Sequence, residues 1–186
     1  MKHLLLSTLL VPTLAACALD APATATRASD LLTTDDTDLP AECAGIIGYA
    51  NWASVAELDG YLPSTVAAAI VARRASAPFV DIADLSSVTG VAQARLAQIT
   101  ARAATLDFID ADCAGVYEEL AVSHDDGVAI LAYVNAASAP ALEDVVRFEK
   151  HTVVPLIIAA RPIATLAQLA DLYGVGPSTF RALRDA

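Results

Sequence analysis

The apolar and polar positions of this chain follow the spacing of short helices. The segment 65–74 is rich in alanine and carries apolar residues three and four positions apart; a short apolar run covers 44–49, and 91–101 is expected to form a further helix. Such spacing places the apolar side chains on one face of a helix. The apolar–polar alternation of a half-buried strand is absent from the sequence. The pattern therefore predicts an all-α protein.

The helical pattern occurs twice. The stretch IIGYANWAS, Ile46 to Ser54, aligns without a gap with ILAYVNAAS, Ile130 to Ser138, 84 residues later. We infer two copies of one helical unit, 42–105 and 126–186, joined by an acidic connector, 106–125. Further identical residues at the same offset are Leu58 and Leu142, Pro78 and Pro162, Leu85 and Leu169, and Gly90-Val91 and Gly174-Val175.

Polar residues at fixed offsets mark where several of these helices begin. The spacing of a capping box occurs at Ser54 and Glu57 and again at Thr165 and Gln168. In this motif the first side chain accepts a hydrogen bond from the backbone N–H of the third helical residue. Pro177 suits the first position of a final helix, because its missing N–H would be unpaired there in any case.

The N-terminus has the layout of an export signal. Lys2 precedes an apolar run, Leu4 to Leu14, that is too short to span a bilayer. The tetrad that ends at Cys17, Leu-Ala-Ala-Cys, resembles the bacterial lipobox, which implies a signal peptide at 1–16 and a lipidated Cys17. By the enterobacterial sorting rule, the following Ala18 implies the outer membrane of the cell envelope. The alternative is an ordinary cleaved signal with an incidental cysteine.

The residues after the cysteine and the overall charge bear on what the chain can bind. Residues 17–41 are poor in large apolar groups and are expected to form a disordered tether. The chain has a formal net charge of -11, most of it in the tether and the connector, so that each helical unit is nearly neutral. Because neither unit has a Lys/Arg cluster, affinity for DNA is predicted to be weak.

Two cysteines remain after Cys17. Cys43 and Cys113 lie in similar contexts, Ala-Glu-Cys-Ala-Gly and Ala-Asp-Cys-Ala-Gly. In an exported protein an even number of cysteines favours a disulfide, and two separate buried thiols are the alternative. Two cysteines without a CxxC motif are too few ligands for zinc, and no metal site or cofactor is expected.

The segment 72–99, ARRASAPFVDIADLSSVTGVAQARLAQI, resembles the helix-hairpin-helix repeats of competence-type DNA receptors, the ComEA-like group. The resemblance implies two tandem helix-hairpin-helix units. The chain departs from that pattern at the first hairpin of each copy and at Ala92, which replaces the closing glycine of the second hairpin. The matching positions in the first copy are Asn51, Ala53, Ser54, Arg73 or Arg74, Pro78, Phe79, Asp84, Leu85, Gly90 and Val91.

The Gly-Val-Gly turn at 174–176 is the candidate anion site. Backbone amides at the start of a helix favour an anion, and Arg181 and Arg184 follow within the same helix. The alternative is that the glycines only let two helices pack closely. The candidate phosphate-binding residues are Gly174, Val175, Gly176, Arg181, Gly90, Val91 and Arg95.

No residues form a recognisable catalytic arrangement, and we expect no enzymatic activity and no small-molecule substrate. His124 and His151 are expected at the surface. Trp52 belongs either to the core or to an exposed anchor for a partner. The sequence favours a lipid-anchored envelope module for protein–protein interaction, and the alternative is an extracytoplasmic DNA-binding protein.

Overall fold

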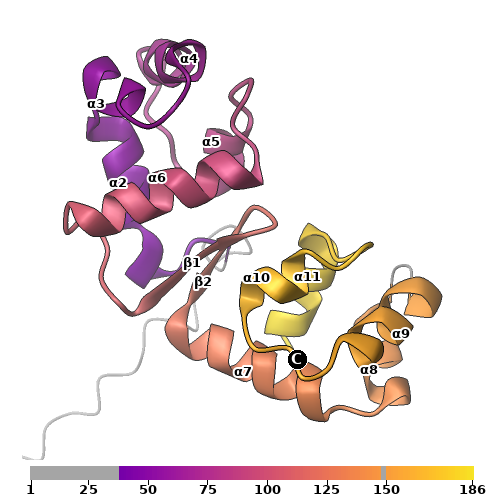
Figure 1. The fold of residues 1–186 in the computed structure, drawn as a ribbon. Coiled ribbons are helices and arrows are strands. Elements are labelled where there is room, and N and C mark those ends of the chain that lie inside the picture. Colours follow the sequence, from indigo (N-terminus) through magenta and orange to yellow (C-terminus); the bar gives the residue numbers. More distant parts are fainter. Residues whose placement is uncertain (1–37, 148–149) are drawn as a thin grey trace, which may run out of the picture. The chain divides into compact units, whose positions relative to one another are not determined.

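The computed structural model describes residues 38–147 and 150–186, and these are mostly helical (Figure 1). The predicted signal peptide, the lipidation site Cys17 and most of the predicted tether lie outside the described residues. The first elements are the 3-10 helix η2 (Ala41–Cys43), α2 (Gly45–Trp52), α3 (Val55–Asp59), α4 (Ser64–Arg74), α5 (Ile82–Ser86) and α6 (Gln93–Thr105). After strands β1 (Cys113–Tyr117) and β2 (Leu120–Ser123) come α7 (His124–Ala136), α8 (Ala139–Val145), α9 (Lys150–Ala160), α10 (Leu166–Ala170) and α11 (Pro177–Arg184).

Polar side chains cap the N-termini of several helices, as their sequences predict. The full capping box at Thr165 is confirmed, because its hydroxyl accepts the Gln168 amide and the Gln168 side chain accepts the Thr165 amide. At Ser54 only the first of these bonds forms, to the Glu57 amide at 3.1 Å. The Glu57 carboxylate instead accepts a hydrogen bond from Arg102. A tertiary ion pair has displaced the second half of the predicted box.

In each half of the chain, an asparagine side chain forms two hydrogen bonds with the backbone of a residue 28 positions later. The Asn51 side chain donates to the Phe79 carbonyl at 2.9 Å and accepts the Phe79 amide at 2.8 Å. Asn135 does the same with Ile163, at 2.8 Å in both bonds. Both pairs have the offset of the sequence repeat. The duplicated Asn is therefore explained by one structural role.

In each half, an arginine donates a hydrogen bond to the backbone carbonyl of the residue just before that asparagine. Arg74 donates to the Ala50 carbonyl at 2.6 Å, and Arg161 donates to the equivalent carbonyl of Val134, also at 2.6 Å. In the alignment, however, Arg161 corresponds to Ala77 and not to Arg74. The contact is shared although the arginine that makes it lies three alignment positions further along the second half.

A β-hairpin occupies the segment that the sequence predicts to be an acidic connector. Strands β1 and β2 are antiparallel, with Val116 opposite Ala121 and Tyr117 opposite Leu120, and the register is irregular between Cys113 and Gly115. The predominantly helical character is thus confirmed, but the prediction that strands are absent is wrong here.

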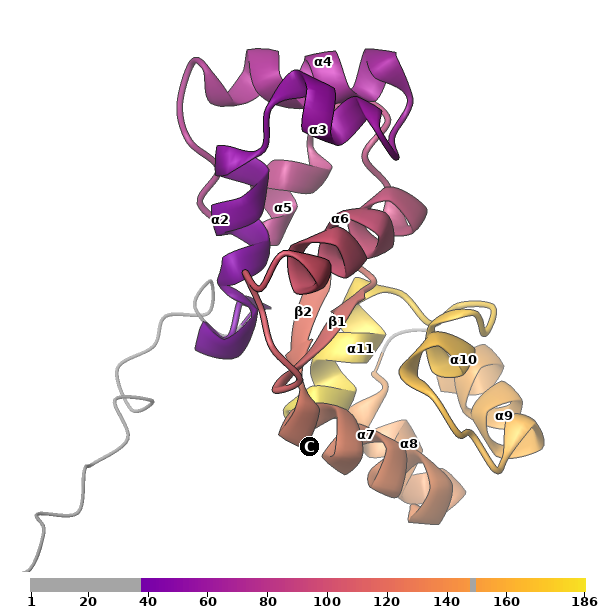
Figure 2. The ribbon, with the colours of Figure 1, turned by 60° about the vertical axis from the view of Figure 1, so that its left-hand side comes forward.

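Both faces of the hairpin are buried, and this explains why its strands lack the apolar–polar alternation that would have predicted them. Val116 and Ala121 belong to a core that α2, α4, α5 and α6 also line. Leu120 and Val122 belong to a second core, lined by α7, α9, α10 and α11 (Figure 2). A strand covered on both sides needs apolar residues at consecutive positions, so the expected alternation does not arise.

The predicted disulfide is present. Cys43, at the end of η2, is bonded to Cys113 at the start of β1, across a sequence separation of 70 residues. Cys43 is fully buried, and Cys113 is 9% exposed. The bond fixes the first helical half to the hairpin.

Candidate functional site

An exposed aromatic cluster lies at the end of α2. The ring of Trp52 lies 5.4 Å from that of Phe108 and 6.2 Å from that of Tyr49, and Tyr49 meets Phe108 edge to face at 5.4 Å. Tyr49 is fully buried, whereas Trp52 is 61% exposed. The core placement of Trp52 is therefore wrong. The indole lies against the rings of the buried Tyr49 and the partly buried Phe108, and it presents most of its surface to solvent.

Tyr49 also belongs to a chain of side-chain hydrogen bonds. The Tyr61 hydroxyl donates to Tyr49 at 3.0 Å, the Tyr49 hydroxyl donates to Glu57 at 3.4 Å, and Arg102 donates to Glu57 at 2.7 Å. The hydrogen bond from Arg102 lowers the pKa of Glu57 below its usual value. Burial raises the pKa of Tyr61 and of Tyr49. At neutral pH both phenols are therefore protonated and can donate, and the Glu57 carboxylate is charged and can accept.

The predicted anion-binding turn has the backbone that its glycines suggest. Gly174 has φ of +84°, in the left-handed region that favours glycine. Val175 is buried, and its amide donates to the Leu172 carbonyl at 3.0 Å. That amide is unavailable to an anion.

The second glycine of the turn behaves differently. Gly176 has an extended backbone with φ of -127°, which any residue can adopt, and a Cβ added there would meet no atom within 4 Å. Neither backbone conformation nor packing requires glycine at this position. Open space lies at the start of α11, next to amides that have no partner within the helix.

The corresponding turn of the first half repeats this backbone. Gly90 has φ of +91°, and the Val91 amide donates to the Val88 carbonyl at 2.9 Å. A Cβ on Gly90 would lie 2.9 Å from the Val66 side chain. Glycine is therefore required at this corner by both conformation and space.

The arginines proposed for the anion site are engaged by protein groups. Arg181 binds both carboxylate oxygens of Asp38, at 3.0 and 2.5 Å, and Arg184 reaches the same carboxylate at 3.3 Å. Partial burial of Asp38 opposes its ionisation, but the hydrogen bonds and charges of the two arginines outweigh this and lower its pKa. Arg95 donates to Gln98 within its own helix at 2.7 Å. The structure thus places Arg181 beyond the Gly-Val-Gly turn, but with its charge matched by Asp38.

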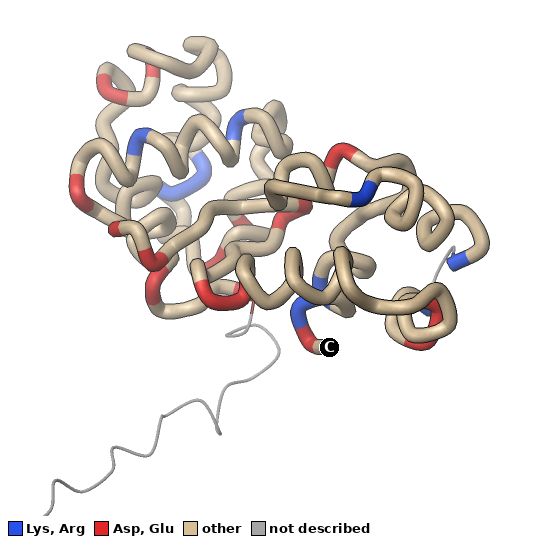
Figure 3. The backbone as a smooth tube through the Cα atoms, turned by 60° about the horizontal axis from the view of Figure 1, so that its bottom comes forward, with Lys and Arg blue, Asp and Glu red and all other residues tan. Residues whose placement is uncertain are grey.

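The remaining charged residues form no larger site. The Lys and Arg positions, blue in Figure 3, are scattered along the described chain and do not gather on one segment. Arg73 donates to the Ala77 carbonyl and pairs with Asp84. His124 and His151 are exposed, as the sequence predicts. Among residues 38–147 and 150–186, no group of three or more His, Cys, Asp or Glu side chains could hold a metal ion.

The comparisons with known proteins yield no relative. No family model, no curated protein and no solved structure matches the chain. Within the described part of the chain, every helix is too short or too polar to cross a bilayer.

Two features of the surface were not anticipated from the sequence. One is the Asp38 carboxylate on Arg181, which joins residues more than 140 positions apart and leaves no local signal. The other is an open cavity lined by α6, β1 and α10. Only the alanine-rich face of α6 could have hinted at it.

Proposed function

We propose that this protein is a non-catalytic binding module, anchored in the bacterial cell envelope through lipid on Cys17, that binds another protein through the surface around Trp52. The observation that carries the proposal is the 61% exposure of Trp52 beside the rings of Tyr49 and Phe108. Tryptophan is among the residues that most often dominate protein interfaces. A large rigid side chain loses little conformational entropy when a partner covers it.

The neighbourhood of Trp52 has the mixed character of an interface. Val55, three residues further along the chain, is 45% exposed, and the Glu57–Arg102 ion pair adjoins the cluster through the hydrogen bond between Tyr49 and Glu57. An apolar centre with a polar rim is the usual anatomy of a non-obligate interface. Two tandem helix-hairpin-helix units would serve here as a scaffold, a role supported by the contacts that recur at the repeat offset.

Site-specific photo-crosslinking in the cells that produce the protein tests this proposal. A photoreactive phenylalanine analogue at position 52 should form a discrete adduct with one envelope protein. The matched control places the analogue at Val128, which is 56% exposed on α7. Adducts of equal yield at both positions, or no adduct at position 52, would reject the Trp52 surface as an interface.

The lipid anchor is tested separately. Metabolic labelling with an alkyne-bearing fatty acid should label the wild-type protein and leave a Cys17→Ser variant unlabelled. Fractionation should move the variant from the membrane pellet to the soluble fraction. Equal labelling of both proteins would remove Cys17 as the attachment site.

Binding of DNA through the turn at 174–176 is the second candidate, and the open space at Gly176 favours it. A phosphate could approach the amides at the start of α11, where the helix dipole favours an anion. Asp38 counts against this function, because it already neutralises Arg181.

A titration with duplex DNA at low and moderate salt separates the two functions. If the turn contacts phosphate, Gly176→Val weakens binding, whereas Ala92→Val at the equivalent position leaves it unchanged. Asp38→Asn should then strengthen binding, because it releases the arginines. Absence of binding even at about 50 mM salt, where phosphate contacts are strong, excludes the DNA function.

A further inference from the structure

A cavity of about 390 Å³ opens between α6, strand β1 and α10. Its size falls within the range of small-molecule sites. The walls consist largely of small side chains, among them Ala97 and Ala101 from α6 and Ala167 and Ala170 from α10. Because these side chains are short, the space between the elements stays open, and its surface is mainly apolar.

Two polar atoms at this cavity lack hydrogen-bond partners among the described residues. They are Oε1 of Gln93 and Oγ1 of Thr100; both residues line the cavity, and both oxygen atoms are buried. Thr100 is only 9% exposed. The Gln93 amide is held in place, since its Nε2 donates to the Val116 carbonyl at 2.7 Å, so its oxygen is left without a donor. A buried polar group without a partner is costly, and a ligand N–H group would remove this cost.

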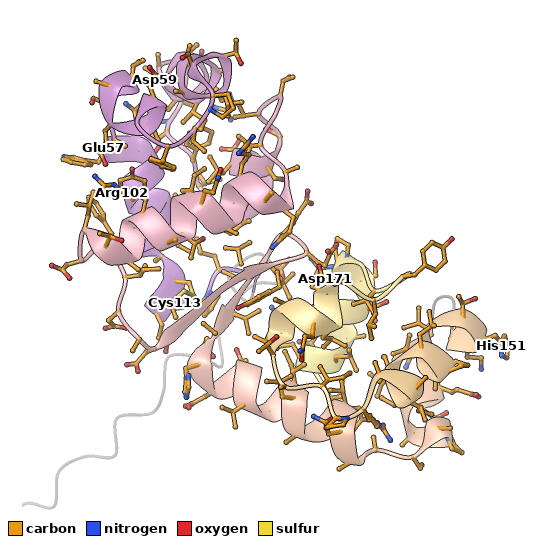
Figure 4. All side chains as sticks on the ribbon, viewed as in Figure 1. Glu57, Asp59, Arg102, Cys113, His151 and Asp171 are labelled. Atoms are coloured by element: carbon orange, nitrogen blue, oxygen red, sulfur yellow. A yellow bond between two sulfur atoms is a disulfide. The ribbon has the colours of Figure 1, made fainter. Side chains whose placement is uncertain are left out.

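The charged residues of the cavity all carry the same sign. Glu118 and Asp171 line it, and no Lys, Arg or His is among its lining residues. Asp171 lies beside the turn of the hairpin (Figure 4). Burial raises the pKa of Glu118, and the neighbouring charges of Glu119 and Asp171 raise it further. Nothing in the wall compensates this negative potential.

The backbone holds Glu118 at the cavity in an unfavourable conformation. Glu118 and Glu119 form the turn between β1 and β2, with φ of +50° and +64°. Two-residue hairpin turns of this kind favour Asn and Gly, and glutamate there costs conformational energy. Compared with Asn or Gly at these positions, the two glutamates add negative charge near the cavity and destabilise the turn.

We propose that this cavity binds a small amphipathic amine, with the apolar part against the alanines of α6 and α10 and the ammonium group between Glu118 and Asp171. The ammonium or a second N–H of the ligand would donate to Gln93 Oε1 or Thr100 Oγ1. The ligand is bound and not transformed. An anion would be repelled by both carboxylates, and a neutral apolar molecule would leave both oxygens unpaired.

Titration of the full-length protein with phenethylamine, followed by methyl NMR of alanine and threonine, tests the proposal. Saturable shifts should appear at Thr100 and Ala101. Nine non-hydrogen atoms can support a dissociation constant of about 1 mM. The neutral analogue 2-phenylethanol should bind about tenfold more weakly, because it lacks the charge-assisted hydrogen bond, and 3-phenylpropionate should not bind.

Variants of the hairpin turn separate ligand binding from a structural role. Glu118→Asn should raise the melting temperature, because Asn tolerates a left-handed backbone, and should weaken phenethylamine binding about tenfold. Glu119→Asn is the matched control: it changes the same turn and the same charge, but its side chain lies outside the cavity, so binding should change about twofold or less. Ala101→Leu should abolish binding by filling the cavity.

Three results would each overturn the proposal. The first is the absence of saturable shifts up to about 10 mM phenethylamine, well above the expected dissociation constant. The second is equal affinity for phenethylamine and 2-phenylethanol. The third is an equal loss of binding in Glu118→Asn and Glu119→Asn, which would point to non-specific attraction by net charge.

Discussion

Asn51 and Asn135, which lie 84 positions apart, each pair their side-chain amide with the N–H and the C=O of one buried residue, Phe79 and Ile163 respectively. Each Asn side chain thus satisfies both backbone hydrogen-bonding groups of that residue, as a neighbouring strand would in a sheet. This relationship explains why Asn occurs at both positions of the repeat.

Loss of either asparagine should destabilise the protein to a similar extent. Asn51→Ala and Asn135→Ala each leave one buried N–H and one buried C=O unpaired, which costs about 2–4 kcal/mol in the free energy of unfolding. Denaturant unfolding followed by circular dichroism measures the change. The control is Ser86→Ala, which removes one exposed hydrogen bond and should cost less than about 0.5 kcal/mol. A cost below about 1 kcal/mol for both Asn variants would contradict this role.

The disulfide should contribute substantially to stability. Closing a loop of 70 residues is worth about 4 kcal/mol on the chain-entropy model. The double variant Cys43→Ser, Cys113→Ser should lose about this amount in denaturant unfolding. A thiol assay on the denatured wild-type protein, before reduction, should find neither Cys43 nor Cys113 free. Two reactive thiols in the protein isolated from its native compartment would show that the bond does not form there.

The Asp38–Arg181 pair should make stability depend on pH in the acid range. Because the folded state lowers the pKa of Asp38 below 3.8, its contribution is present above that pH and is lost as the pH falls through the lower, folded pKa. Solvent screening limits the contribution to about 0.5–1 kcal/mol. The free energies of unfolding of wild type and Asp38→Asn should differ at pH 6, and the difference should shrink as the pH falls below 3.8. A constant difference across this range would exclude Asp38 as the titrating group.

Two glycines that look alike in the sequence should respond in opposite ways to alanine. Gly90→Ala forces a Cβ into a left-handed backbone and within 2.9 Å of Val66, and should cost about 1–3 kcal/mol. Gly176→Ala meets open space in an extended backbone, and should be neutral or stabilise by up to about 1 kcal/mol. Thermal unfolding of the two variants gives the comparison. A marked loss on Gly176→Ala would indicate packing that the structure does not show.

The aromatic surface and the cavity could not be predicted from the sequence for different reasons. Trp52 occupies a helical position next to buried residues, so its pattern fits the core equally well, and its exposure depends on where the chain places Phe108. The cavity combines α6, the hairpin and α10, which are distant in the sequence. An alanine-rich helix face predicts close packing as readily as an open space.

The sequence by itself determined the local structure: the helical segments, the caps at Ser54 and Thr165, the glycine corners and the offset at which the unit recurs. It could do so because these features depend on backbone preferences and on spacing within a few residues. Tertiary structure decided the rest. It placed a hairpin where both faces are buried, so that no alternation marks it, and it bound Arg181 to Asp38. It also left Trp52 exposed, because burial depends on neighbours that only the folded chain brings together.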